Sequence, residues 1–221
     1  MRHLVISDYD RTLFDSGRYE RAIRQILHDE FHLDPVAFGK EIHARTDAGG
    51  YDLFAHLADH NISASTAHSI ITDTLGAESF LYPDAVHFLR QMSALPEIDL
   101  AVVTVGSPAY QQLKLEYLQQ AAPHIPARVV GINKGTWLET SWLRRELHPL
   151  GRHIEFEGTP YSKVAVVDDK TDTFAAMTPA PHILMVHLLR PDAKYQDTID
   201  APTITQDLAA AASLIAGWMA E

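Results

Sequence analysis

Short runs of aliphatic residues recur along the chain, and helix-like stretches separate the last four of them. Runs of this length and bulk suit strands that are buried on both faces of a sheet. Strands that alternate with helices form right-handed β-α-β units, in which the strands are parallel. The pattern therefore predicts an α/β fold with a doubly wound parallel sheet, whose strands cover residues 4–7, 100–105, 128–132, 164–167 and 183–189.

The pattern changes between the first and second of these strands, where hydrophobic residues recur at helical spacing. Ile23, Ile26 and Leu27 form one such group. Spacings of three and four residues place side chains on one face of a helix. We therefore expect a helical insertion, residues 15–81, within a core of residues 1–14 and 82–221.

Two helices are predicted to begin directly after strands. Pro108, which follows a serine N-cap, predicts a helix over residues 109–122. Thr136 and Glu139 form a capping box for a helix over residues 137–148. The N-termini of both helices would lie at one edge of the sheet, where they favour anions.

Composition limits the partners that the chain can have. Its 221 residues are 46% hydrophobic, which is ample for a core. With 18 Lys and Arg against 29 Asp and Glu, the net charge of −11 disfavours a nucleic-acid backbone or an anionic membrane as the main partner. The absence of cysteine excludes disulfides and thiolate catalysis. Without a recognisable signal peptide or membrane span, we expect a cytoplasmic location.

Pairs of acidic residues follow two of the predicted strands. Asp8 and Asp10 follow the first strand, and Asp168 and Asp169 follow the fourth. Because parallel strands end at one edge of the sheet, where ligands bind, these carboxylates are expected to converge. Neighbouring carboxylates repel, so they acquire a cation, share a proton or titrate apart. For the first pair alone, a role in capping the loop is an alternative.

The second and third strands add other chemistry to the same edge. The second ends in Thr104, Val105 and Gly106, which offer a hydroxyl and a backbone that a ligand can approach closely. Lys134 follows the third strand and offers an ammonium group.

The order and spacing of these groups resemble the haloacid dehalogenase (HAD) superfamily over essentially the whole chain. The insertion resembles the helical cap of that superfamily's first cap class, so the resemblance implies a Rossmann-like core with an inserted α-helical cap. It is carried by Asp8-Tyr9-Asp10-Arg11-Thr12-Leu13-Phe14, Thr104, Lys134 and Asp168-Asp169.

The resemblance implies a role for each catalytic group. Asp8 would attack phosphorus and form an aspartyl-phosphate, which water then hydrolyses. Asp10 would protonate the leaving oxygen and deprotonate the water, which requires a pKa raised by burial and by the neighbouring carboxylate. Thr104 would hydrogen-bond the phosphoryl group, and Lys134 would neutralise its charge.

The resemblance also implies a magnesium site. Asp8, the backbone carbonyl of Asp10 and the later acidic pair would hold Mg²⁺, which prefers oxygen ligands. The sequence leaves Asp168 and Asp169 interchangeable as the direct ligand.

These roles predict a magnesium-dependent phosphatase that hydrolyses a small phosphorylated metabolite, a phosphomonoester. Displacement of halide from carbon needs no acid for the leaving group, so Asp10 favours phosphoryl transfer over dehalogenation. A phosphomutase and a non-catalytic HAD-like binding or regulatory protein are the alternatives. A receiver-type signalling domain is shorter than this chain, and its phosphorylated aspartate normally ends the third strand, where Lys134 follows here.

Substrate contacts are expected from the motif and from the insertion. Thr12, Val105 and Gly106 are candidates in the core, where Val105 and Arg11 depart from the usual pattern; the family commonly has glycine at the position of Arg11. In the insertion the candidates are Arg18, near the expected hinge at residues 16–17, and Arg45, near the glycine pair at residues 49–50. An exposed charge is the alternative for both.

Histidine pairs in the insertion allow a second hypothesis. His28 with His32, and His56 with His60, are spaced to share a helix face and could bind a transition metal. Because a metal site needs a complete ligand set, solvated or half-buried histidines are the favoured alternative.

Overall fold

The structure is a computed structural model that describes residues 1–47, 51–131, 133–145, 153–190 and 202–221. The strands of these residues form one sheet, with six parallel strands in the order β3-β2-β1-β6-β7-β8. Two further strands, β4 and β5, continue it antiparallel through the first part of β6. The strands are β1 (Arg2–Ser7), β2 (Ile98–Val105), β3 (Ala127–Val130), β4 (Trp142–Arg145), β5 (His153–Phe156), β6 (Thr159–Asp168), β7 (Ile183–Leu188) and β8 (Thr203–Thr205).

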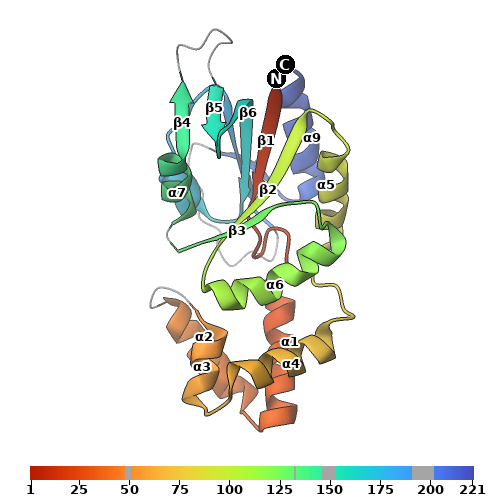
Figure 1. The fold of residues 1–221 in the computed structure, drawn as a ribbon, viewed down its shortest axis with the longest axis vertical. Helices are drawn as coiled ribbons and strands as arrows, with labels where there is room; N and C mark the ends of the chain where they lie inside the picture. Colours follow the sequence, from red (N-terminus) through yellow and green to blue (C-terminus); the bar gives the residue numbers. More distant parts are fainter. Residues whose placement is uncertain (48–50, 132, 146–152, 191–201) are drawn as a thin grey trace.

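Helices cover both faces of the sheet, as the predicted doubly wound fold requires (Figure 1). Val5 of β1 faces a hydrophobic cluster that includes α5 (Pro83–Ser93) and α9 (Leu208–Ala220). Its neighbours Leu4 and Ile6 face a second cluster, to which α7 (Lys134–Ser141) and α8 (Thr171–Ala175) contribute. The alternation of buried residues along β1 therefore fixes the two layers of helices.

The helix predicted over residues 137–148 is wrong in length. In the structure α7 ends at Ser141, and its N-cap is Asn133, whose side chain accepts a hydrogen bond from the backbone N–H of Thr136 at 3.1 Å. Trp142 then begins β4, where it pairs with Phe156 of β5. Pairing with a strand distant in sequence overrides the local helical pattern; the end of the predicted helix, residues 146–148, lies outside the described residues.

Four helices separate β1 from α5 and lie beyond the carboxyl ends of the strands, with α6 (Pro108–Ala121) between them and the sheet (Figure 1). The chain enters and leaves this helical segment through two short connections, whose backbones are hydrogen-bonded to each other. The Asp15 N–H donates to the Phe80 carbonyl at 2.8 Å, and the Tyr82 N–H donates to the Leu13 carbonyl at 2.9 Å. The helices are α1 (Ser16–Phe31), α2 (Pro35–Asp47), α3 (Leu53–Asp59) and α4 (Ala64–Leu75).

A cluster of aromatic side chains fills the junction between the helical segment and the core. Phe14 and Phe80 lie on the paired connections, and their rings contact Tyr19 of α1 and Tyr117 of α6. Phe14 and Phe80 are fully buried. The segment is therefore joined to the core by packed apolar surface as well as by the two connections.

None of the described helices combines the length and the hydropathy that a membrane-spanning helix needs.

Candidate active site

Three of the predicted site residues meet in one buried ion cluster at the carboxyl edge of the sheet. Asp8 leaves the end of β1, Asp168 ends β6, and Lys134 begins α7. The Lys134 ammonium donates to an Asp8 carboxylate oxygen and, at 2.6 Å, to Oδ2 of Asp168. Thr173 also donates to Oδ2 of Asp168 at 2.8 Å, so this carboxylate is fixed by several partners.

Asp169 completes the cluster, but no described residue donates a hydrogen bond to its carboxylate. Its carboxylate oxygen lies within 4.8 Å of oxygens of Asp8 and Asp168, and its Oδ1 is buried without a hydrogen bond. The cluster thus holds three carboxylates against one ammonium group. Buried oxygens without a donor carry a large desolvation cost, which a bound cation removes.

Burial and mutual repulsion also shift the pKa values of the groups in the cluster. Burial raises the pKa of Asp8 to about 6, although Lys134 acts in the opposite direction. Burial, and repulsion from Asp8 and Asp168, raise the pKa of Asp169 well above its ordinary value. Burial disfavours the Lys134 ammonium, but attraction to Asp168 and Asp8 outweighs it and raises the pKa of Lys134.

The other residues predicted at this edge lie after β1 or at the end of β2, the neighbouring parallel strand. Thr104 is buried near the end of β2, and Thr12 is buried with its hydroxyl lacking a hydrogen-bond partner. Val105 is 41% exposed. Gly106 has a φ of +150°, and a side chain there would collide with Gln111, so the turn after β2 requires glycine.

Asp10 differs from the expectation of a raised pKa. Its carboxylate accepts two hydrogen bonds from the Lys114 ammonium at 2.6 Å, one from Gln111 at 2.8 Å and one from Ser16 at 2.5 Å. Burial alone would raise the pKa, but the Lys114 charge and these hydrogen bonds outweigh it and lower the pKa of Asp10 to about 2. The expected rise is therefore wrong for this arrangement.

The sequence analysis missed these partners of Asp10. Gln111 and Lys114 are both buried on α6, three residues apart and thus on one helix face. The sequence shows only that Gln111 and Lys114 are three residues apart on a predicted helix; it indicates neither their burial nor which carboxylate they meet.

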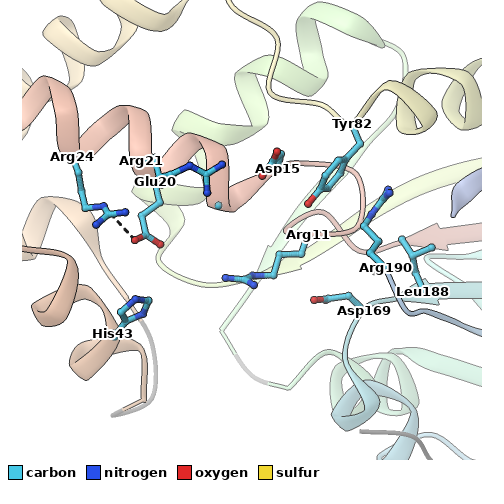
Figure 2. A pocket seen from close by; sticks show the side chains of 11 residues that line it. Arg11, Asp15, Glu20, Arg21, Arg24, His43, Tyr82, Asp169, Leu188 and Arg190 are labelled. Carbon is cyan, nitrogen blue, oxygen red and sulfur yellow. Dashed lines mark ion pairs between the residues drawn. The ribbon is translucent and has the colours of Figure 1, made fainter. Parts of the chain in front are cut away.

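A cavity of about 420 Å³ opens between Asp169 and the helical segment. Figure 2 shows Asp169 and Arg11 pointing into it from the core, and Arg21, Glu20 and Arg24 reaching it from α1. Its other lining residues include His43 of α2, Tyr82 and Arg190. A cavity of this size matches the sites that hold small molecules.

Two of these arginines have acidic partners. Arg24 pairs with Glu20 at 3.6 Å. Arg190 contacts both carboxylate oxygens of Asp84 at 3.0 Å. Their charges are neutralised within the protein.

The two arginines predicted to contact substrate do not reach this cavity. Arg18 pairs with Glu78 at 2.7 Å and lies over the Phe80 ring. Arg45 pairs with Asp59 at 2.6 Å. The nearby glycine pair, residues 49–50, lies outside the described residues.

One of the two histidine pairs joins a cluster in the helical segment. Nε2 of His56 lies 2.7 Å from Oε2 of Glu41, and Nε2 of His60 lies 3.2 Å from the same oxygen. The Tyr51 hydroxyl lies 3.2 Å from Nδ1 of His56. The ligand set that the sequence left incomplete therefore gains a carboxylate, but hydrogen bonds already satisfy the buried His56 ring.

The other pair does not form such a cluster. His28 contacts the Leu33 carbonyl, and His32 is an exposed helix C-cap.

The sequence matches no protein-family model and no curated protein, whereas the fold has many solved counterparts. A haloacid dehalogenase-like hydrolase of Burkholderia xenovorans is 17% identical, with a TM-score of 0.69 over 99% of this chain and 98% of the other. An L-2-haloacid dehalogenase of Xanthobacter autotrophicus is 12% identical, with a TM-score of 0.56 over 98% and 99%. CbbY of Rhodobacter sphaeroides, in complex with phosphate, is 13% identical, with a TM-score of 0.55 over 95% and 96%.

The chain therefore has the fold of the HAD superfamily, as its motifs predicted. The similar structures include both a dehalogenase and a protein bound to phosphate, so fold alone does not choose the reaction. The choice rests on the residues of this site.

Proposed function

We propose that the protein is a magnesium-dependent phosphatase that hydrolyses a small phosphomonoester through an aspartyl-phosphate on Asp8. The observation that carries the proposal is the excess of negative charge in the cluster, where Asp8, Asp168 and Asp169 lie together and, among the described residues, Lys134 alone forms ion pairs with Asp8 and Asp168. A carboxylate can attack a phosphoryl group only if the charges of both are neutralised.

The donor set fits magnesium. Asp8 and Asp169 offer carboxylate oxygens, and the Asp10 carbonyl remains the predicted third protein ligand. Asp169 suits the role of direct ligand because its Oδ1 has no other partner, whereas Asp168 is occupied by Lys134 and Thr173. The ion would supply positive charge beside the phosphoryl oxygens.

The reaction then divides into two displacements on this chain's residues. A carboxylate oxygen of Asp8 forms a bond to phosphorus as the bond to the leaving oxygen breaks, with Lys134 held beside the nucleophile. In the second step water attacks phosphorus, gives up a proton and regenerates the Asp8 carboxylate. We assign the proton transfers of both steps to Asp10.

The position of Asp10 sets a condition on this assignment. A carboxyl group with a pKa of about 2 carries no proton near neutral pH. Asp10 can therefore protonate a leaving group only after its contact with Lys114 is broken. The helical segment, which supplies Ser16 to the same carboxylate, is placed to couple that change to substrate binding.

Inorganic phosphate release from a panel of small phosphomonoesters with Mg²⁺ tests the proposal. We expect release that is lost with a chelator and in Asp8→Asn. Isomerised sugar phosphate without phosphate release would instead indicate a phosphomutase. Halide release from haloacids would indicate a dehalogenase, and no turnover in any assay would favour a non-catalytic role.

A further inference from the structure

The cavity beside Asp169 is lined by Arg11 and by Arg21, an exposed residue of α1. Among the described residues, the Arg11 and Arg21 side chains form no ion pair or hydrogen bond, in contrast to Arg24 and Arg190. Asp15 also lines the cavity, and its carboxylate caps α1 by accepting a hydrogen bond from the backbone N–H of Arg18. Guanidinium groups that line a cavity without an internal partner are available to bind oxyanions.

The backbone at Arg11 supports a functional reading of this side chain. Arg11 has a φ of +63°, in the left-handed region that favours glycine. Its N–H donates to the Phe14 carbonyl at 2.7 Å, so the tight turn after Asp10 imposes this conformation. A non-glycine residue persists in such a position at a cost to stability, which is characteristic of functional sites.

The direction of the side chain indicates what it meets. Figure 2 shows Arg11 extending from the core loop into the space between Asp169 and α1, while Arg21, which also lines the cavity, reaches from α1 toward Asp15. A phosphoryl group on Asp8 would lie beside Asp169, so the remainder of the substrate would extend into this cavity. Arg11 would then meet a group a few atoms away from the phosphorus.

We infer that Arg11 and Arg21 form a subsite for a second oxyanion of the substrate, either a carboxylate or a second phosphoryl group. The inference rests on the proposed function and narrows its substrate class to phosphomonoesters that carry another anionic group. The core supplies one guanidinium and the helical segment supplies the other, so such a substrate would bridge the two parts of the molecule.

Arg11→Gly is the informative variant because glycine suits the backbone at this position. We expect an unchanged or higher Tm, which separates loss of binding from loss of folding. The probes are phosphoglycolate, ethanediol bisphosphate and hydroxyethyl phosphate; the last carries a neutral hydroxyl where the first carries a carboxylate. Arg128→Gln, on an exposed ion pair of β3, is the matched control.

For the unsubstituted protein, kcat/KM should be higher for phosphoglycolate or for ethanediol bisphosphate than for hydroxyethyl phosphate. Which of the two is preferred shows whether the subsite binds a carboxylate or a second phosphoryl group. In Arg11→Gly, kcat/KM for the preferred probe should fall by roughly tenfold or more, because a charge-assisted hydrogen bond is lost. Hydroxyethyl phosphate, which lacks a second anion, should lose distinctly less, so the ratio of the two kcat/KM values should fall in Arg11→Gly. Equal losses on all probes, or no loss on any, would overturn the inference.

Binding measurements separate this inference from the proposed function. If no probe is hydrolysed, the proposed function fails, but calorimetric titration of Asp8→Asn with the same probes in Mg²⁺ still tests the subsite. We expect the preferred probe with a second anion to bind more tightly than hydroxyethyl phosphate. This difference in affinity should disappear in Asp8→Asn/Arg11→Gly. Equal affinities of Asp8→Asn for hydroxyethyl phosphate and for the probes with a second anion would reject the subsite.

Discussion

Asp8 and Asp10 leave the same strand two residues apart, yet their surroundings are opposite. Asp8 shares one lysine with two other carboxylates, and burial raises its pKa to about 6. Asp10 has Lys114 to itself, with Gln111 and Ser16 as further donors, and its pKa is about 2. The surplus of negative charge at Asp8 indicates where a cation and a phosphoryl group belong, whereas Asp10 is already neutralised by the protein.

The largest effect that would test this contrast is expected from Asp8→Asn. Without the nucleophile, kcat should fall by about four orders of magnitude or more. The fold should remain, because Lys134 keeps Asp168 as a partner. Steady-state phosphate release and circular dichroism measure both. Substantial residual turnover would contradict the role of Asp8.

The stability of Asp8→Asn relative to the unsubstituted protein should also depend on pH, in a direction that follows from the pKa of Asp8. The folded-state pKa of Asp8, about 6, lies above the ordinary value of 3.8, so ionisation of Asp8 costs stability as pH rises through this window. In metal-free buffer at about pH 8, Asp8→Asn should therefore be at least as stable as the original protein. Urea unfolding at about pH 4 and pH 8 checks the direction.

The assignment of the metal ligand is sharpened by comparing Asp169→Asn with Asp168→Asn. Saturating Mg²⁺, at about a hundred times its Kd, should stabilise the original protein by about 2.7 kcal/mol. We expect this gain to be largely lost in Asp169→Asn and to persist in part in Asp168→Asn, because Asp168 chiefly holds Lys134. Thermal unfolding with and without Mg²⁺ measures it. The reverse order would exchange the two roles.

Lys114→Met would remove the neutralising charge at Asp10. The depressed pKa contributes about 2 kcal/mol of stability, present above pH 3.8 and lost as pH falls toward 2. In the variant, burial without Lys114 raises the pKa of Asp10, so the stability difference between the two proteins should shrink by at least that amount between about pH 7 and pH 2. Urea unfolding across this range measures it. A constant difference would show that Lys114 does not control the ionisation of Asp10.

The smallest effect is expected at the second cluster of ligand-type residues, in the helical segment. Glu41→Ala leaves the buried His56 Nε2 without its partner and should cost about 1–3 kcal/mol of stability. The response to Mg²⁺ should not change. Glu30→Ala, at an exposed position of α1, is the control. Zn²⁺ binding that disappears with Glu41 would show that this cluster also holds a metal.

The sequence predicted what depends on local pattern and on strand ends. The aliphatic run of β1 and the acidic residues after β1 and β6 indicated a shared edge, because parallel strands must end together. Pairing distant in sequence was not predictable. Lys114 lies 104 residues from Asp10, and strands β4 and β5, of four residues each, are too short to stand out against a helical pattern.

The paired connections at Asp15–Phe80 and Leu13–Tyr82 also bear on how such a protein can be rebuilt. Because backbone hydrogen bonds hold the two ends of the helical segment side by side, a short turn could close the core where the segment is removed, and a different segment could be inserted at the same point. The reacting aspartates would keep their places on the sheet, while Arg21 and the other helical residues of the cavity would be exchanged. The nucleophile and the acidic cluster would thus stay with the core, while the part of the substrate-binding surface that the helices supply could be replaced.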